Sequence, residues 1–320
     1  MDYNDNHSIA YSMLTYYCAY FRYHYPLQFL TSFLNNAAND EDIANGTAYA
    51  GQIGITITLP KWGVSRAEYS FDTERNCIAK GLSSIKYISK SLPEELYKLA
   101  HAAKYERFVD VLEALKTTSI DSRQLDILIK IDFFSEFGNQ RELLRILDIY
   151  KDLFKSGDAK KVDRRKIDGT PLEEIVKPYV IGTTKSGDTA KSYTIVDIGS
   201  IMAEIEDAVK ESSMPDIDLK VRVQNVVDAM GYMGYVTGAQ EDRAKLYVQS
   251  VYALKRKKDG KQFGYSVVTK SIGSGKESRM SIMNRDLDGL TPPKAGDIIQ
   301  CLGWRRDGAY FQITSYKTIL

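Results

Sequence analysis

The sequence has few cysteines and no long apolar run. The three cysteines, Cys18, Cys77 and Cys301, are far apart and odd in number. They support neither a disulfide framework nor a zinc site, and we expect a cytoplasmic protein. No apolar run approaches the ~20 residues that a membrane-spanning helix needs. The start of the chain also lacks the basic and then apolar pattern of a secretory signal, so we expect no membrane partner.

Charge is almost balanced over the whole chain but unevenly distributed. The formal net charge is +1, and the chain is 43% hydrophobic and 27% charged, as is typical of a globular protein. From Lys245 to Leu320 there are 14 Lys and Arg against 6 Asp and Glu, a net charge of +8, which leaves −7 for the remaining residues. A basic C-terminal part on an acidic body indicates that this end faces a polyanion. At 320 residues we expect two or three domains.

The first 26 residues predict an aromatic-rich helix. Apolar side chains recur every three or four residues, which is typical of the buried stripe of a helix, and Pro26 ends the pattern. The stripe consists of Ile9, Met13, Tyr16, Tyr17 and Tyr20. A stripe of this kind needs a partner layer, which is either the segment 27–54 or another protein.

This stretch resembles a segment in the fingers region of the bacterial DNA polymerase III alpha subunit, the C-family replicative polymerase. The match rests on Asn6, His7, Ser8, Ala10, Tyr11, Tyr16 or Tyr17, His24, Tyr25 and Pro26. In that family the segment follows the catalytic palm, whereas here it begins at residue 6. We therefore expect His7, Ser8, Tyr11 and His24 to be fingers-motif residues. The chain would then be a split or truncated polymerase portion whose N-terminus forms a protein interface.

The next segments also follow the order of that family. Further helices are predicted at 27–34, 40–53, 105–115, 122–131, 142–154, 198–210 and 221–230, and short strands at 55–60, 69–71 and 77–80. Gly81 to Ser89 resembles the family's helix-hairpin-helix sequence GLGAIKGVG, with Ser83, Tyr87 and Ser89 in place of glycines. Such hairpins bind phosphate through backbone N–H groups, and Lys80 and Lys86 would be the local cations. In the second hairpin Asp132 replaces a glycine. We expect 182–192 to be a loop because it is rich in Gly, Ser, Thr and Lys.

From Lys245 the pattern changes to a period of two, which predicts five strands and an OB-fold barrel. OB-folds bind single strands through a basic groove and stacked aromatic rings. The predicted DNA-binding residues here are Lys255, Arg256, Lys257, Lys258, Lys261, Phe263, Tyr265, Trp304 and Tyr310. The alternative is that the lysines keep an edge strand soluble and that the rings fill the barrel.

The sequence lacks the catalytic aspartates of the family. The family holds two Mg²⁺ ions with palm aspartates in a string like PDxDxD. Here Pro215, Asp216 and Asp218 are followed by Lys220 where a third carboxylate is needed. We therefore expect no catalytic or metal site, no cofactor in this chain, Mg²⁺ only in a palm portion elsewhere, and no enzyme activity of the chain alone.

A sliding-clamp motif is a further possibility. Bacterial clamp ligands resemble QxxLF, and Tyr150, Leu153 and Phe154 fall in a similar string, with Tyr150 replacing the glutamine. The string also continues an amphipathic helix, so its apolar residues could instead be core.

Taken together, the sequence predicts an α+β multidomain chain. A mainly helical N-terminal part would hold the fingers tail (1–75) and a tandem helix-hairpin-helix module (76–154). Linker and connector helices (155–244) and an OB-fold domain (245–320) would follow. The function predicted is that of a non-catalytic polymerase portion that handles template and duplex DNA beside a palm-bearing chain. The alternative is a stand-alone single-stranded-DNA-binding or sliding-clamp adaptor protein.

Overall fold

The computed structural model describes residues 3–153, 160–186, 189–287, 289–308 and 310–319. The chain forms two compact units, residues 1–86 with 219–320, and residues 87–218. Each unit is described by itself. Among the helices of the described ranges, none is both long and apolar enough to cross a membrane.

The first unit begins with three helices, α1 (Tyr3–His24), α2 (Pro26–Asn35) and α3 (Asp40–Gln52). Pro26 at the start of α2 separates α1 from α2, because proline lacks the N–H that would continue a helix. Leu27, Leu30 and Leu34 form the buried face of α2, whereas Phe29 is half-buried and Phe33 is exposed. Gly46 does not interrupt α3. A Cβ there would lie 2.9 Å from the Phe33 ring, so the glycine lets α3 pack closely against α2.

A small sheet follows these helices. Its strands are β1 (Thr56–Thr58), β2 (Ser70–Asp72) and β3 (Cys77–Ala79), in the order β1-β3-β2. β3 pairs parallel to β1 and antiparallel to β2. Ile78 on β3 is fully buried and packs with Leu27, Leu30 and Ile55 in one core, which fixes the sheet against α2. The 3₁₀ turn η1 (Leu82–Ser84) leads out of β3.

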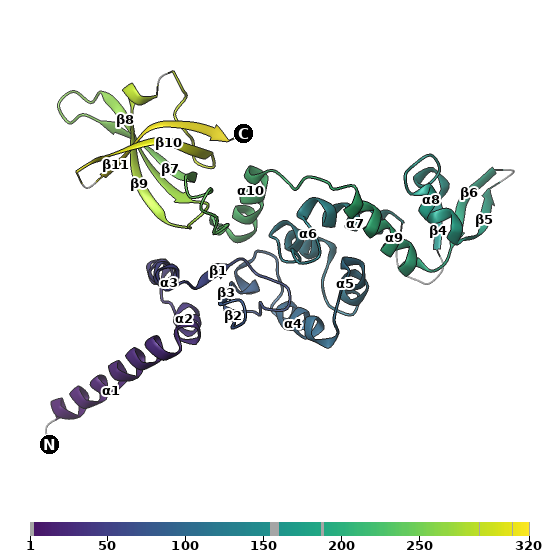
Figure 1. The fold of residues 1–320 in the computed structure, drawn as a ribbon, viewed down its shortest axis with the longest axis horizontal. Coiled ribbons are helices and arrows are strands. Elements are labelled where there is room, and N and C mark those ends of the chain that lie inside the picture. Colours follow the sequence, from purple (N-terminus) through teal and green to yellow (C-terminus); the bar gives the residue numbers. More distant parts are fainter. Residues whose placement is uncertain (1–2, 154–159, 187–188, 288, 309, 320) are drawn as a thin grey trace. The chain divides into compact units, whose positions relative to one another are not determined.

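The remainder of this unit is α10 (Leu219–Met230) and a closed barrel of five strands (Figure 1). The strands are β7 (Lys245–Lys255), β8 (Gln262–Ser271), β9 (Glu277–Met283), β10 (Ile298–Asp307) and β11 (Tyr310–Ile319), with the 3₁₀ turn η4 (Asn284–Asp286) after β9. Their order in the barrel is β10-β11-β9-β8-β7. Alternate side chains such as Val248, Val267, Ile299 and Ile313 fill the interior. The predicted OB-fold barrel is confirmed.

The second unit contains the helices of the hairpin module and a smaller sheet. The helices are α4 (Leu92–Ala102), α5 (Phe108–Leu115), α6 (Ser122–Lys130), α7 (Gln140–Leu153), α8 (Glu173–Val176) and α9 (Ile198–Glu211). The 3₁₀ turns η2 (Arg164–Lys166) and η3 (Lys177–Tyr179) flank α8. The packed rings of Phe108, Phe133 and Phe134 lie in the core between the helices.

The sheet of the second unit was not predicted. Its strands are β4 (Lys160–Asp163), β5 (Val180–Ser186) and β6 (Thr189–Ile195), in the order β4-β6-β5, all antiparallel. The expectation of a loop at 182–192 is therefore wrong. These residues are polar and small, but their backbone groups pair across the sheet, and Tyr193 and Ile195 bury their side chains.

Candidate nucleic-acid interface

The β7–β8 hairpin presents a cluster of exposed cations. Arg256 N–H donates to the Lys261 carbonyl at 2.9 Å, which closes the turn, and Gly260 supplies the left-handed conformation at φ 67°. Asp259 does not pair with a lysine but accepts a hydrogen bond from the Lys261 backbone N–H. All five predicted cations are exposed: Lys255, Arg256, Lys257, Lys258 and Lys261. We refer to these five residues as the hairpin cations.

Two of the predicted aromatic residues lie beside the other hairpin, between β10 and β11. Trp304 and Tyr310 are 62% and 69% exposed, whereas Phe263 and Tyr265 on β8 are only half-buried. Phe311, which we did not predict, packs edge-on against Trp304 with 5.4 Å between ring centroids. In OB-folds the loop between the first and second strands of the barrel and the loop between the fourth and fifth frame the nucleic-acid-binding strands. The hairpin cations and Trp304 occupy the equivalents of these two places, and Figure 1 draws both hairpins at the left end of the barrel.

Other exposed side chains of the barrel were not predicted from the sequence. Tyr252 on β7 is 59% exposed, and Arg279 on β9 and Arg306 on β10 are also exposed. Each is a single residue inside a strand with no neighbouring motif. Only the closed barrel shows that these side chains point outward, so no sequence signal could have identified them.

The first helix-hairpin-helix turn keeps its backbone shape without its glycines. Tyr87 has φ 69°, the left-handed conformation that a glycine would favour. Its carbonyl accepts a hydrogen bond from the Gln124 side chain, and the Arg123 guanidinium lies 3.5 Å from the centroid of its exposed ring. This cation–π contact and the carbonyl bond hold a tyrosine where the resemblance places a glycine.

The second hairpin shows the same substitution. Asp132, in place of the family's glycine, has φ 65°. Its carboxylate accepts a hydrogen bond from the buried Gln140 side chain at 2.9 Å. Asn139 and Glu142 then exchange side-chain-to-backbone hydrogen bonds at the start of α7. Both hairpins therefore keep the left-handed turn, although their sequences depart from the glycine pattern.

Lys80 and Lys86 differ in their surroundings. Lys86 is exposed, and its backbone N–H donates to the Ala229 carbonyl of α10. Lys80 is half-buried, and its Nζ lies 4.8 Å from the centroid of the Tyr232 ring. Burial lowers the pKa of Lys80 to about 7, and the positive charge of Lys270 contributes to the same shift.

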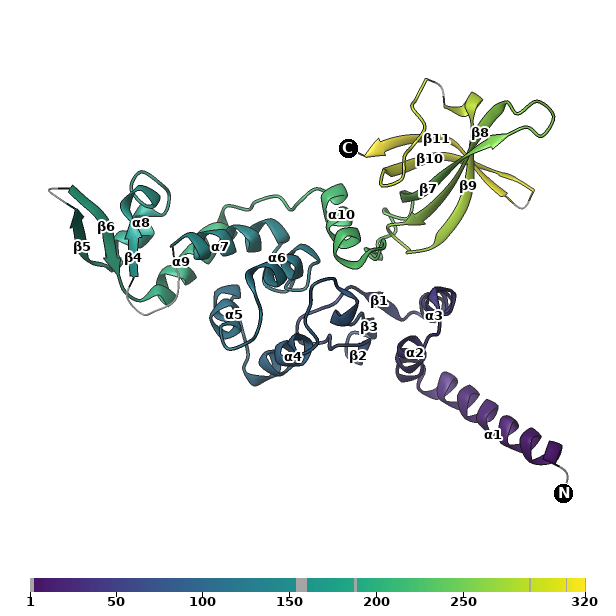
Figure 2. The same cartoon turned by 180° about the vertical axis from the view of Figure 1, so that it is seen from behind.

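The predicted fingers-motif residues lie on α1, which is exposed along its length. Ser8 is exposed, and Tyr11 is 67% exposed; the side chain of His7 lies outside the described side chains. The ring of His24 packs against Tyr20 with 4.4 Å between centroids. Both views show α1 as a straight helix that extends from α2 (Figures 1 and 2). The predicted stripe on α1 exists, but α2 and α3 do not cover it.

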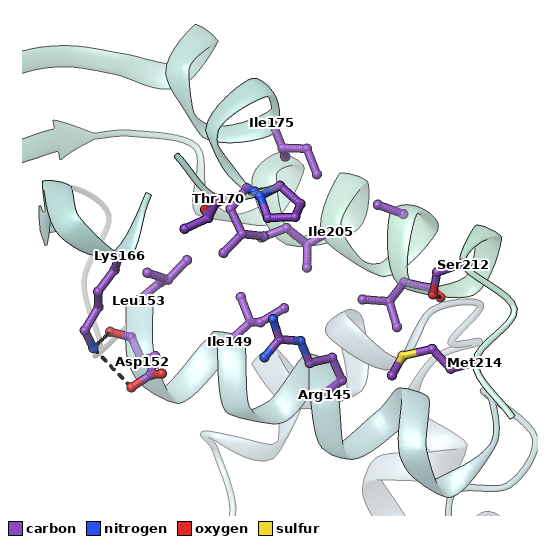
Figure 3. Close-up of a pocket in the computed structure, with 14 residues that line it drawn as sticks. Arg145, Ile149, Asp152, Leu153, Lys166, Thr170, Ile175, Ile205, Ser212 and Met214 are labelled. Carbon is purple, nitrogen blue, oxygen red and sulfur yellow. Dashed lines mark hydrogen bonds and ion pairs between the residues drawn. The ribbon is translucent and has the colours of Figure 1, made fainter. Parts of the chain in front are cut away.

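The predicted clamp motif lies at the end of α7 beside a cavity of about 360 Å³ in the second unit. Leu153 is buried and lines this cavity together with Ile149 and Ile205 (Figure 3). The hydroxyl of Tyr150 donates to Glu113 at 3.1 Å. Phe154 lies outside the described residues. Leu153 would have to leave its packing to enter a partner's pocket, and clamp binding stays a prediction.

The aspartate string lies in the irregular segment that precedes α10. Asp216 is half-buried and Asp218 is exposed there, and the helix begins at Leu219. Within the described ranges, no group of three or more His, Cys, Asp and Glu side chains could hold a metal ion. The expectation that this chain holds no metal site stays a prediction.

Comparison with known proteins bears on the helix-hairpin-helix segment. Residues 54–144, which include both hairpins, match the helix-hairpin-helix motif family. The DNA polymerase III subunit alpha of Bacillus subtilis (strain 168) is 29% identical over 161 residues, 49% of this chain and 14% of the relative. The chain resembles a part of the DNA polymerase III alpha subunit.

Two further alpha subunits give the same result. That of Thermus aquaticus is 28% identical over 148 residues, or 46% of this chain and 12% of the relative. That of Aquifex aeolicus is 27% identical over 203 residues, or 60% of this chain and 17% of the relative. The matched part thus spans less than a fifth of each of these alpha subunits. The resemblance drawn from the N-terminal and hairpin sequences is confirmed, as is the mainly helical part followed by a barrel.

Proposed function

We propose that this chain handles template and duplex DNA as a non-catalytic portion of a polymerase related to the DNA polymerase III alpha subunit. The observation that carries the proposal is the order of parts in one chain. A helix-hairpin-helix segment similar to the alpha subunit precedes a closed barrel that exposes five cations at one hairpin. Hairpins of this kind hold phosphates, and OB-type barrels bind single strands, so the two parts suit the two forms of DNA at a primer end.

The barrel is the part of this proposal that can be tested by charge. For single-stranded DNA, the logarithm of the binding constant falls linearly with the logarithm of the salt concentration, and each phosphate contact adds about 0.7 to the slope. The exposed Lys257 and Lys258 lie at the tip of the β7–β8 turn. If both bind phosphates, the double variant Lys257→Gln and Lys258→Gln lowers the salt slope by about 1.4.

The measurement is fluorescence anisotropy of a labelled single-stranded oligonucleotide at several salt concentrations. The matched control is Lys161→Gln with Lys191→Gln, which removes two exposed lysines from the β4–β6 sheet of the other unit. We expect the control to bind as the parent does. An unchanged slope in the hairpin variant, or an equal loss in both variants, would refute the barrel as the binding site.

A partner with a palm is the second part of the proposal. Its support is the exposed apolar face of α1, which includes Tyr16, Tyr17, Tyr20 and Phe21 at 40–65% exposure. A row of exposed apolar side chains on one helix face is typical of a surface that binds another protein. We propose that the α1 face packs on the palm-bearing portion, which supplies the metal-binding aspartates and carries out nucleotide addition.

Primer extension tests this pairing. A palm-bearing fragment of an alpha subunit should extend a primer further when this chain is added. The variant Tyr16→Ser with Tyr20→Ser should lose the gain, and the Lys161→Gln, Lys191→Gln variant should keep it. No gain with the parent chain would argue against a split polymerase and favour a stand-alone DNA-binding protein.

Clamp binding is tested separately with a peptide of residues 146–158 and purified clamp. No binding at high micromolar concentration would refute the clamp hypothesis.

A further inference from the structure

Three lysines converge on the short segment that follows α10. The Lys80 amine lies over the Tyr232 ring and would come within 3.0 Å of a Cβ at Gly234. The Lys270 amine on β8 donates to the Met233 carbonyl at 2.9 Å. The Lys86 amine would lie 3.9 Å from a Cβ at Gly231. The three cations come from distant parts of the sequence. Gly234 makes room for the Lys80 amine, whereas a Cβ at Gly231 would be in ordinary contact with Lys86.

No carboxylate forms a close ion pair with the cations of this cluster, Lys80, Lys86 and Lys270, within the described residues. Glu277 is paired with Lys270 in the strand register and acts on it through its charge. The other titratable groups nearby are Tyr232 under the Lys80 amine, Tyr247 opposite Lys270 in the strand register, and the exposed Asp228 at the end of α10, whose charge acts on Tyr247. A half-buried pair of cations that repel each other is costly unless an anion joins them.

We propose that Lys80, Lys86 and Lys270 together bind one phosphate group of the DNA backbone. This inference rests on the proposed DNA-handling function and goes beyond it, because it places a phosphate on the segment 231–234 and not on the barrel hairpin. Lysine is a point charge with three donors, which suits a phosphate oxygen approached from several sides. A free phosphate or pyrophosphate has the same chemistry, and the experiment separates the two sources.

Phosphate binding at this site would be linked to protonation. The pKa of Lys80 is about 7 because of its burial and the charge of Lys270, so the amine is half neutral at that pH. A bound phosphate favours the charged form and raises the pKa, so binding takes up a proton. DNA affinity should therefore fall as pH rises above about 7. Between pH 7.0 and 8.5 the linkage relation predicts a loss of about 15-fold.

The experiment measures affinity for a primer–template DNA by anisotropy at pH 7.0 and 8.5 and constant salt. Arginine stays charged at both values, so the Lys80→Arg variant should bind well and lose most of the pH dependence. Lys80→Met should bind more weakly at pH 7.0 and also lose the dependence. The hairpin variant Lys257→Gln, Lys258→Gln serves as the matched control, because it should lower the salt slope and keep the pH dependence.

Each outcome decides the matter. A parent chain without pH dependence, or a dependence that persists in Lys80→Arg, overturns the site. If the parent chain binds no DNA, the proposed function fails, and pyrophosphate is then tested by isothermal titration calorimetry. If pyrophosphate binds, and both Lys80→Met and Lys86→Gln weaken its binding, the phosphate site is supported with a free phosphate as its ligand. No pyrophosphate binding would overturn the site. Circular dichroism identifies a variant that fails to fold, and Lys86→Gln, at an exposed position, then carries the test.

Discussion

The buried carboxylate of Glu206 should hold the hairpin module together. Its side chain is fully buried on α9 and accepts hydrogen bonds from the N–H groups of Phe108 and Val109, at 3.0 and 2.9 Å, in the first turn of α5. Lys210, one turn further along α9, pairs with it at 2.6 Å. A carboxylate at a helix N-terminus binds N–H groups that have no partner within the helix.

Glu206→Gln is the perturbation that isolates these bonds. The amide has nearly the same shape but only one acceptor oxygen, so one of the two N–H bonds is lost and the amine of Lys210 loses its ion pair. A hydrogen bond to a charged group contributes about 1.5–3 kcal/mol. We expect the local opening of α5 to become easier by about 2 kcal/mol, which corresponds to amide exchange about 30-fold faster.

Hydrogen exchange measured by mass spectrometry on peptides that cover residues 103–116 gives the readout. The control is Glu211→Gln on the same helix, where the side chain is exposed and the exchange should not change. Unchanged exchange at Phe108 and Val109 in Glu206→Gln would mean that the carboxylate does not stabilise α5, and the reasoning would be refuted.

Three further predictions concern the second helix-hairpin-helix turn, the half-buried Lys80 and the barrel. Asp132→Ala should lower the free energy of unfolding by about 2–4 kcal/mol, because alanine disfavours φ 65° and the Gln140 side chain loses its acceptor. Asp132→Asn should lower it by less than about 1 kcal/mol. Urea unfolding of the two variants and the parent chain compares these free energies. For Lys80, the folded-state pKa of about 7 lies below the ordinary lysine pKa of 10.5, so the unfolded chain binds more protons between these values. Stability should therefore rise from pH 7 to 9, and Lys80→Met should flatten the rise in melting temperature. Trp304 is exposed and Trp62 is buried, so single-stranded DNA should quench the tryptophan fluorescence of the parent chain but not that of Trp304→Phe. Trp304→Ala should weaken the binding of single-stranded DNA by about 1–3 kcal/mol.

Local patterns predicted most of the regular elements. Helices such as α5, α6 and α9 start and end within a few residues of their predicted bounds, because their apolar residues recur at helical spacing and, in α6 and α9, an aspartate caps the start. Asp121, for instance, caps α6 in a capping box with Gln124. The barrel strands follow from alternation in the same way. The strands β5 and β6 were missed because their small polar residues carry no alternation, and pairing across the sheet alone makes them strands.

The candidate site was predicted only in part. Four of the five hairpin cations are consecutive in the sequence, and all five lie in or next to the turn between β7 and β8, so their exposure follows from the turn itself. Lys270 is a single lysine inside a strand, and nothing near it in the sequence connects it with Lys80. The packing of the segment that contains Met233 and Gly234 brings the two charges close enough to interact.

The sequence by itself determined which residues share a face of α1, where the barrel strands run, and that the chain resembles part of an alpha subunit. These properties depend on neighbours in the chain, so a single sequence contains them. Only the tertiary structure decided that the α1 face is exposed, that Tyr87 and Asp132 keep the left-handed turns of absent glycines, and that Lys80 lies beside Lys270. Burial and the distances between charges depend on segments far apart in the sequence, and the free energy of packing brings those segments together.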